Sequence, residues 1–224
     1  LIEPVQGEGG VRDIGTTFLR ALRSLCDKHG ILLGFDEVQC GIGRTGKLFA
    51  HEWAEVTPDV MAIAKGIGGG FPLGALMSTK AVGSAMQPGS HGSTYGGNPL
   101  SIAAANAVLD VIAEEDLLNR ANRLGSYLKQ RLEAIRATTP EIAEIRGPGF
   151  MVAAEFMTED GAPNPDMTNA VRLEAQKRGL ILLTCGVYGN VIRFLAPLTI
   201  EEEVLAEGVD ILEASIAAVK EKQA

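Results

Sequence analysis

The residue with the clearest chemical potential in this sequence is Lys65, the only charged residue of an apolar and glycine-rich run over residues 60–71. Residues 60–64 are typical of a short buried strand, and the glycines after Lys65 let bare backbone approach a bound group. We expect a lysine at the end of such a strand to be partly desolvated, which favours the neutral, nucleophilic amine. Taken alone, a lysine in this position is more commonly a side chain that extends from a strand end into water.

A second segment, residues 31–39 (ILLGFDEVQ), supplies a chemical partner for Lys65. It is also typical of a buried strand, and it ends in the adjacent carboxylates Asp36 and Glu37. Consecutive strand residues point to opposite faces, so the two carboxylates cannot share one task, and Asp36 is the better candidate. Without Lys65, a solvated strand end would explain this pair equally well.

A lysine and an aspartate at the carboxyl ends of two strands suit pyridoxal 5'-phosphate (PLP) especially well. This cofactor needs a lysine amine for its aldehyde and a carboxylate for its ring nitrogen, which keeps the ring protonated and able to accept electrons. Ligands of open α/β sheets bind outside the carboxyl ends of the strands, where both groups would lie. The two segments therefore predict a PLP site around Lys65 and Asp36.

Five motifs carry a resemblance to a known family. In chain order they are EPVQGEGG (3–10), FDEVQ (35–39), GRTG (43–46), AK (64–65) and GSTYGGNP (92–99). Through these motifs the chain resembles the class-III aminotransferases of PLP fold type I, the group containing acetylornithine and 4-aminobutyrate aminotransferases. The resemblance extends over essentially the whole chain, and the motifs are specific in combination although each is only suggestive alone.

The resemblance implies a role for each matching residue near the cofactor. Lys65 would bind the cofactor aldehyde covalently and then shuttle a proton between substrate and cofactor. Asp36 would pair with the ring nitrogen, Gln39 would hydrogen-bond the phenolic oxygen, and Val38 would pack on one face of the ring. Thr94, with Ser93 beside it, would bind the phosphate of the neighbouring subunit, which implies a homodimer with shared active sites.

The resemblance also implies a substrate switch. Glu8 would form a salt bridge with Arg193, and Glu3 would support the same region. In the family this arginine binds the α-carboxylate of glutamate or 2-oxoglutarate, and the glutamate masks it when an ω-amine donor is bound. Without the resemblance, Arg193 would be interpreted as an ordinary strand arginine on a solvated face.

The identity of the amino donor stays open in the sequence. Up to about residue 99 the chain looks most like acetylornithine aminotransferases, whereas residues 179–193 look like 4-aminobutyrate aminotransferases. Both imply ping-pong transfer of a terminal amine to 2-oxoglutarate, and N-acetylornithine is slightly favoured because the cofactor-proximal residues lie in the first part. Two alternatives are a PLP-dependent aminomutase, which the Glu8–Arg193 pair disfavours, and a non-catalytic fragment.

The start of the sequence suggests a partial chain. Leu1 opens directly inside a predicted strand, and family members are about twice this long. We therefore expect the sequence to be the C-terminal portion of an aminotransferase. If nothing precedes Leu1, the expectation is weak cofactor binding and little activity.

Composition excludes several other classes of protein. The 224 residues carry a net charge of −8 with no basic stripe, which disfavours nucleic acid and anionic membranes as partners. No apolar run approaches the length that spans a bilayer, and no signal peptide is present. Three cysteines, an odd number, suit a reducing cytoplasm, and the three histidines show no metal-ligand spacing, so no metal site is predicted. Residues 41–46 (GIGRTG) match a dinucleotide-binding pattern but are better interpreted as a glycine-rich turn, since no convincing helix follows.

The expected fold is α/β, with residues 1–113 as part of a PLP fold-type-I large domain and residues 114–224 as a small α+β C-terminal domain. Near-continuous apolar strands predict a mostly parallel sheet, buried on both faces and flanked by helices. Strands are predicted over 1–5, 31–38, 60–64, 74–78, 151–156, 180–183 and 191–195. Helices are predicted over 17–29, 99–113, 117–136 and 169–178, with a last helix opened by a capping box at 199–202.

Overall fold

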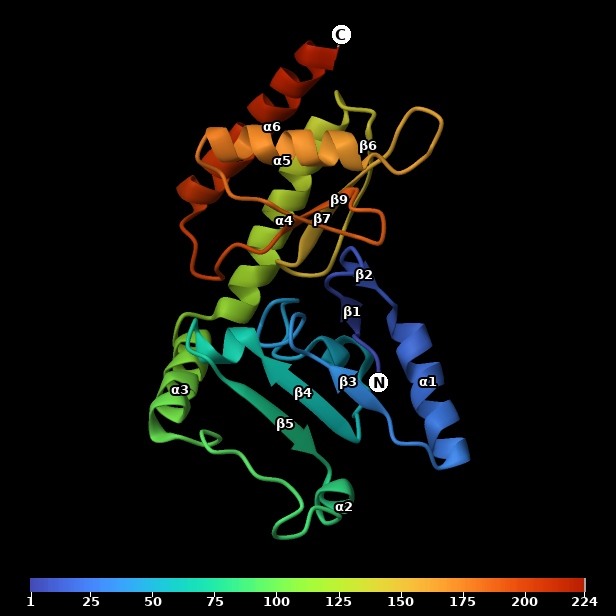
Figure 1. Cartoon of the computed structure of the whole chain (residues 1–224), viewed down its shortest axis with the longest axis vertical. Coiled ribbons are helices and arrows are strands. Elements are labelled where there is room, and N and C mark those ends of the chain that lie inside the picture. The colour runs from blue at the N-terminus through green and yellow to red at the C-terminus, as the bar shows by residue number, and fades with distance from the viewer. Residues whose placement is uncertain (224) are drawn as a thin grey trace. The chain divides into compact units, whose positions relative to one another are not determined.

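The computed structural model describes residues 1–223, and the described chain divides into two compact units (Figure 1). Unit 1 consists of Leu1–Val5 and Ile14–Leu118, and unit 2 consists of Gln6–Asp13 together with the chain from Asn119 onward. The predicted boundary after residue 113 falls inside a helix, α3 (Pro99–Glu114). The assignment of the early segment to unit 2 has no counterpart in the sequence prediction.

Unit 1 contains a three-stranded sheet in the order β3-β4-β5. Strands β3 (Gly34–Asp36) and β4 (Val60–Ala64) are parallel, as expected. Strand β5 (Gly74–Ser78) runs antiparallel to β4, so the prediction of a mostly parallel sheet is wrong for this strand. The connection explains the difference, because a parallel crossover needs about a dozen residues or more and only residues 65–73 join β4 to β5.

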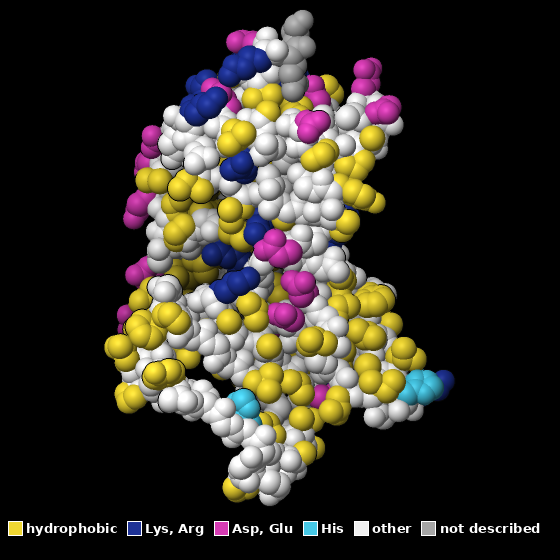
Figure 2. All heavy atoms as spheres, in the orientation of Figure 1, with side chains coloured by type: hydrophobic (Ala, Val, Ile, Leu, Met, Phe, Trp, Pro, Cys, Tyr) yellow, Lys and Arg dark blue, Asp and Glu magenta, His cyan; other side chains and the backbone are white. Residues whose placement is uncertain are grey.

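The sheet of unit 1 is also less buried than the sequence predicts. In β4 every second side chain is buried, namely Met61 and Ile63. Every residue of β5 is exposed, and Leu76 and Met77 keep exposed fractions of 63% and 46%. Burial on both faces is therefore wrong for β5, an edge strand with one neighbour. Figure 2 shows further hydrophobic side chains on the surface of unit 1. Leu100 of α3 keeps an exposed fraction of 65%.

Helix α1 (Thr16–His29) confirms the predicted amphipathic helix. Its buried side chains Leu19 and Cys26 pack with Phe35 of β3. The helix ends at Gly30, which has a φ of 64° and so adopts the left-handed conformation that favours glycine. Packing of α1 against β3 thus sets the position of the strand that ends in Asp36.

The remaining elements of unit 1 are short or connect it to the next unit. The predicted helix at 99–113 is confirmed as α3, and the predicted strand at 1–5 is reduced to a bridge between Ile2 and Phe35 plus β1. Strand β1 (Val5–Gln6) spans the division between the units and pairs with β2 (Arg12–Asp13), which belongs to unit 2. The short elements within unit 1 are η1 (Ala50–Ala54), η2 (Lys65–Gly68) and α2 (Lys80–Gly83).

Unit 2 contains an antiparallel four-stranded sheet in the order β6-β7-β9-β8, and Figure 1 shows helices α4, α5 and α6 beside it. The strands are β6 (Ile142–Arg146), β7 (Val152–Phe156), β8 (Leu183–Cys185) and β9 (Val191–Phe194). The helices are α4 (Leu117–Arg136), α5 (Pro165–Lys177) and α6 (Glu202–Gln223).

The core of unit 2 forms where these helices cover the sheet. Leu124, Leu128 and Leu132 are buried as a leucine stripe along one side of α4, which confirms the helix predicted over residues 117–136. They join Ile192 of β9 and Leu212 of α6 in one hydrophobic cluster. Burial of this cluster fixes β9, and with it the strand position that carries Arg193.

Three details of unit 2 differ from the prediction. Strand β6 was not predicted, because residues 142–146 (IAEIR) combine three apolar residues with two charges and show no clear strand pattern. The strand expected over 180–183 lies at 183–185 instead. The last helix begins at Glu202, so Thr199 does not cap it.

Among the described helices, none combines the length and the apolar character needed to cross a membrane.

The tight contact at Gly125 of α4 allows a test of this packing. A Cβ atom at this position would lie 1.7 Å from the carbonyl oxygen of Gly149. Although alanine is the better helix former, we expect Gly125→Ala to lower the free energy of unfolding by about 1–3 kcal/mol, because the helix must shift. Urea unfolding would measure the change. Ser126→Ala, an exposed change in the same helix, is the control and should stay within about 0.5 kcal/mol of the wild type; equal effects would contradict the packing.

Candidate functional site

The parallel pairing of β3 and β4 places Lys65 and Asp36 at the same edge of the sheet. Asp36 is the last residue of β3 and pairs with Ala62 of β4. Lys65 follows directly after the last residue of β4. Both side chains therefore start from the carboxyl ends of adjacent parallel strands, the position at which α/β sheets bind ligands.

The Lys65 side chain is exposed, which differs from the expected partial desolvation. Its neighbours explain the exposure, since Gly66, Gly68 and Gly69 have no side chains to cover it. The backbone of Lys65 has a φ of 52°, in the left-handed region that non-glycine residues rarely adopt. Such strained positions cluster at functional sites, so the conformation supports a role for Lys65 beyond the fold.

Asp36 is half-buried and is held by the turn that follows β3. Its Oδ1 atom accepts a hydrogen bond from the backbone N–H of Val38 at 3.0 Å. Val38 and Gln39, which the resemblance assigns to the cofactor ring, are half-buried in the same turn. Asp36, Val38 and Gln39 thus lie in one turn at the end of β3, and the hydrogen bond from Val38 to Asp36 holds this turn.

Glu37 points the other way and is fully buried. Its carboxylate accepts hydrogen bonds from the backbone N–H groups of Ala50 and His51, each at 2.9 Å, and from the Cys40 thiol at 3.2 Å. The Nδ1 atom of His51 lies 2.9 Å from Glu37 Oε1. Desolvation, followed by the charge of Glu37, raises the pKa of the Cys40 thiol, which stays protonated as a donor. Glu37 is therefore a structural anchor.

The sequence prediction missed this anchor and assigned no chemistry to His51. The alternation of strand residues could have indicated it, because a carboxylate that faces the interior requires buried donors. The glycine-rich segment 41–46 is confirmed as a turn and folds back over Glu37. Within it, burial lowers the pKa of the Arg44 guanidinium to about 10.

The remaining residues predicted for unit 1 lie elsewhere in it. Ser93 and Thr94, which the resemblance assigns to the phosphate of a neighbouring subunit, are exposed in the loop between α2 and α3. Ser93 Oγ accepts a hydrogen bond from the backbone N–H of Gly96 at 2.9 Å, which shapes the loop locally. Glu3 is half-buried just before β1.

In unit 2 the structure joins Glu8 and Arg193 in an ion pair, with 2.6 Å between Glu8 Oε1 and Arg193 Nη1. The Arg193 side chain is 10% exposed, so it is not the arginine of a solvated face. Glu8 is 70% exposed, so its carboxylate reaches the buried guanidinium from the solvent side. The guanidinium of Arg193 is buried, and the glutamate side chain that pairs with it is long and exposed. Such a guanidinium can exchange its glutamate partner for the carboxylate of another molecule.

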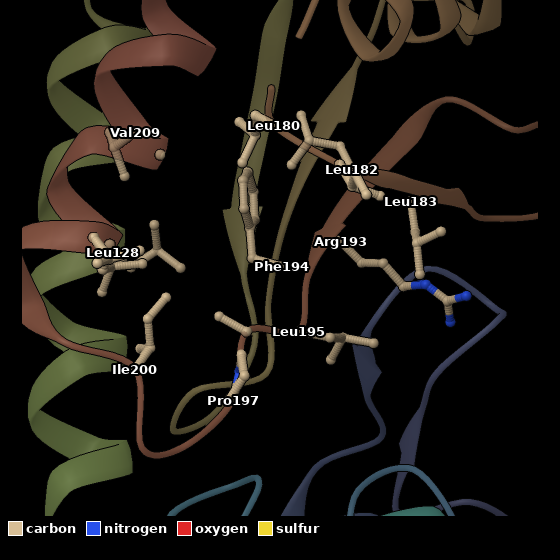
Figure 3. Close-up of a pocket in the computed structure, with 15 residues that line it drawn as sticks. Leu128, Leu180, Leu182, Leu183, Arg193, Phe194, Leu195, Pro197, Ile200 and Val209 are labelled. Atoms are coloured by element: carbon tan, nitrogen blue, oxygen red, sulfur yellow. The ribbon is translucent and has the colours of Figure 1, made fainter. Parts of the chain in front are cut away.

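Unit 2 also holds an apolar cavity of about 390 Å³ beside β9. Figure 3 shows Leu180, Leu182 and Phe194 around it, with Val209 and Ile200 on the helix side. The guanidinium of Arg193 points away from this apolar wall, toward the N-terminal segment that carries Glu8 (Figure 3). Arg193 is itself one of the residues that line the cavity, so its ion pair with Glu8 lies beside the apolar wall.

Comparison with known proteins identifies the family. The model of the class-III aminotransferases matches residues 1–216. Acetylornithine aminotransferase 1 of Bradyrhizobium diazoefficiens is 47% identical over all of this chain and 53% of that protein. The 4-aminobutyrate aminotransferase GabT of Escherichia coli is 48% identical over 95% of this chain and 50% of that protein.

A solved structure agrees with these relatives. The ornithine aminotransferase of Toxoplasma gondii, described with partial occupancy of PLP at its active site, matches with a TM-score of 0.89 and 36% identity. The match covers 98% of this chain and 51% of that one, so the chain spans about half the length of its relatives. The resemblance carried by the sequence motifs is confirmed. The chain belongs to the class-III aminotransferases, a family of PLP-dependent enzymes.

Proposed function

We propose that this chain contributes the central groups of an ω-amino acid aminotransferase, which moves a terminal amine to 2-oxoglutarate by a ping-pong mechanism. The observation that carries the proposal is the position of Lys65 and Asp36 at the carboxyl ends of adjacent parallel strands. The curated relatives named above act on acetylornithine and 4-aminobutyrate, according to their names. N-acetylornithine is the donor that we favour, because the motifs nearest the strand ends resemble acetylornithine aminotransferases.

The residues at this edge fit PLP in their chemistry. When bound, PLP supplies an electron-accepting ring that stabilises negative charge next to the reacting nitrogen. The carboxylate of Asp36 would keep the proton on the ring nitrogen, and the hydrogen bond from Val38 N–H fixes its orientation. Gln39 would hydrogen-bond the phenolic oxygen, and Val38 would pack on the ring. Ser93 and Thr94 would bind the phosphate held by a second subunit, in a homodimer.

Lys65 would hold the aldehyde and afterwards carry the proton that moves during amine transfer. Its exposed amine and the absence of side chains on the glycines that follow leave the nitrogen accessible. The left-handed backbone at Lys65 directs the side chain from the strand end in a fixed direction. These features support a nucleophile that also acts as a base.

The Glu8–Arg193 pair supports a two-substrate reaction. Arg193 would bind the α-carboxylate of glutamate or 2-oxoglutarate once Glu8 has moved aside, and Glu8 would cover Arg193 when an ω-amine donor is present. Glu3 would support this region. An aminomutase moves the amine within a single molecule, so it has no need to expose the arginine for one substrate and cover it for another. The Glu8–Arg193 pair therefore favours transfer between two substrates.

Removal of the Lys65 amine tests the cofactor assignment. With added PLP, we expect the purified protein to show a visible absorption band that Lys65→Ala abolishes, together with a loss of amine transfer of at least about a hundredfold. Lys80→Ala, which removes an exposed lysine of α2, is the matched control and should retain the band. A band that survives in Lys65→Ala, or that disappears equally in Lys80→Ala, would contradict the assignment.

The dependence on an acceptor tests the reaction type. We expect glutamate to form from N-acetylornithine only when 2-oxoglutarate is present, with parallel lines in double-reciprocal plots as the sign of a ping-pong order. The same assay with 4-aminobutyrate would rank the two donors by kcat/KM. Conversion of an amino substrate without any added oxo-acid would instead support the aminomutase.

A further inference from the structure

The loop that carries Glu8 is the turn between β1 and β2. Residues 7–11, which we call the glycine loop, contain three glycines, and Gly10 has a φ of 108° that L side chains rarely adopt. The backbone N–H groups of Gly10 and Val11 donate to the carbonyl oxygen of Gly7 at 3.1 and 3.3 Å, which closes the turn on itself. These hydrogen bonds shape the loop, and its placement against Arg193 depends on support from outside the loop.

Arg146, at the end of β6, supplies this support. Its Nε donates to the carbonyl oxygens of Gly10 at 2.9 Å and Val11 at 3.2 Å, and its Nη2 donates to Gly10 O at 2.7 Å. The Arg146 side chain is 10% exposed. Three hydrogen bonds from one buried guanidinium thus hold the backbone two and three residues beyond Glu8.

Two carboxylates hold Arg146 in this orientation. Its Nη1 donates to Glu144 at 2.7 Å and also forms a short hydrogen bond with Glu155 of β7. Glu155 is further held by Asn190 Nδ2 at 3.2 Å and by Arg12 Nη2 at 3.3 Å. Although burial opposes ionisation, Arg146 keeps the pKa of Glu155 below its ordinary value, so the partner stays charged. The guanidinium is locked in one rotamer by this network.

Sheet register places Arg146 and Arg193 on one face. Arg146 pairs with Ala153, and Ala153 pairs with Arg193, across the three neighbouring strands β6, β7 and β9. Paired residues of antiparallel strands point to the same side, so the two arginines flank the small side chain of Ala153 at about 10 Å from each other. The glycine loop that Arg146 binds therefore lies over the face that presents Arg193.

A second contact fixes the loop on the Glu8 side. The backbone N–H of Gly186 donates to the carbonyl oxygen of Glu8 at 2.9 Å. A Cβ atom at Gly10 would lie 3.2 Å from Arg146 Nη2 and 3.4 Å from Gly186 Cα. The loop is thus held at the Glu8 carbonyl oxygen and again two and three residues later, and a side chain at Gly10 would fit only if its neighbours moved by a few tenths of an ångström.

We propose that Arg146 is a positioning residue that directs Glu8 onto Arg193 and thereby sets how strongly Arg193 accepts the carboxylate of a substrate. This inference rests on the proposed role of Arg193 and Glu8 in the aminotransferase. With the loop held, Glu8 competes effectively for the guanidinium, and a dicarboxylate must displace it. With the loop released, Arg193 becomes available to dicarboxylates, and the discrimination against them in favour of ω-amine donors is lost.

The test uses Arg146→Lys. This variant keeps a positive charge beside Glu155 but cannot make the three hydrogen bonds that the guanidinium donates to Gly10 and Val11. The probe is glutarate, a dicarboxylate without a reactive oxo group, and its binding is measured by calorimetry on the purified protein. We expect Arg146→Lys and Glu8→Gln each to tighten glutarate binding by about three- to thirtyfold. The double variant should bind glutarate no more tightly than Glu8→Gln, because Arg146 acts only through Glu8.

The matched control is Arg136→Lys, since Arg136 also donates to a backbone carbonyl, that of Ile142, and to a carboxylate, that of Glu133, but does not contact the loop. Its glutarate affinity should equal that of the wild type. If Arg146→Lys does not fold, Gly10→Ala disturbs the same contact without removing the arginine and should tighten glutarate in the same direction. A wild-type affinity in the Arg146 or Gly10 variants, or an additive double variant, would overturn the proposal.

Amide hydrogen exchange separates this inference from the proposed function. The Gly186 amide should exchange about three times faster or more in Arg146→Lys, because its acceptor Glu8 O is released, and should not change in Arg136→Lys. Unchanged Gly186 exchange in Arg146→Lys would overturn the positioning role whatever the enzyme does. Faster exchange without glutarate binding in any variant, Glu8→Gln included, would support the positioning role and contradict Arg193 as the carboxylate site.

Discussion

The parallel pairing of β3 with β4 is the constraint on which the chemistry of unit 1 depends. It aligns two strand ends, so that Asp36 and Lys65 leave the sheet at the same edge. Glu37 secures this arrangement from the opposite side, because its buried carboxylate takes hydrogen bonds from Ala50 and His51. An ionised carboxylate left in the interior without such donors would cost several kcal/mol, so the chain after β3 has to fold back over it. The anchor and the candidate site are thus neighbours in sequence that face opposite directions.

Unit 2 also contains buried charged groups, but these are cations. There the buried ionic groups are the guanidiniums of Arg146 and Arg193, and their partners are carbonyl oxygens and carboxylates on one face of an antiparallel sheet. Arginine suits this task because its planar group offers five donors in a fixed geometry. The cavity beside β9 is lined mainly by apolar side chains, and Arg193 also lines it (Figure 3). A single short strand therefore brings ionic recognition and hydrophobic packing next to each other.

Most of the helices, and the strand before Lys65, could be predicted from the sequence because their signals are local. The end of α1 at Gly30 and the leucine stripe of α4 depend on residues a few positions apart. The placement of Lys65 and Asp36 at the ends of neighbouring strands could likewise be predicted, because each follows a short apolar run. Strand β6 and the support from Arg146 could not be predicted in this way, because they depend on pairing with β7 and on contacts with residues far away in the sequence. The sequence prediction missed the exposure of Lys65 and β5. An apolar segment is expected to be buried, but its composition does not tell which other segment covers it.

The division of the chain has a consequence for how the molecule folds. Unit 2 is discontinuous, since residues 6–13 leave unit 1 to pack against a sheet whose strands are made from residue 142 onward. During synthesis the glycine loop emerges long before β9, so the strands against which the loop packs have not yet been made. Contacts of such long sequence separation form late and slow the folding of the domains that need them. Unit 1 interrupts unit 2 in the sequence, and completion of unit 2 therefore has to wait for the last third of the chain.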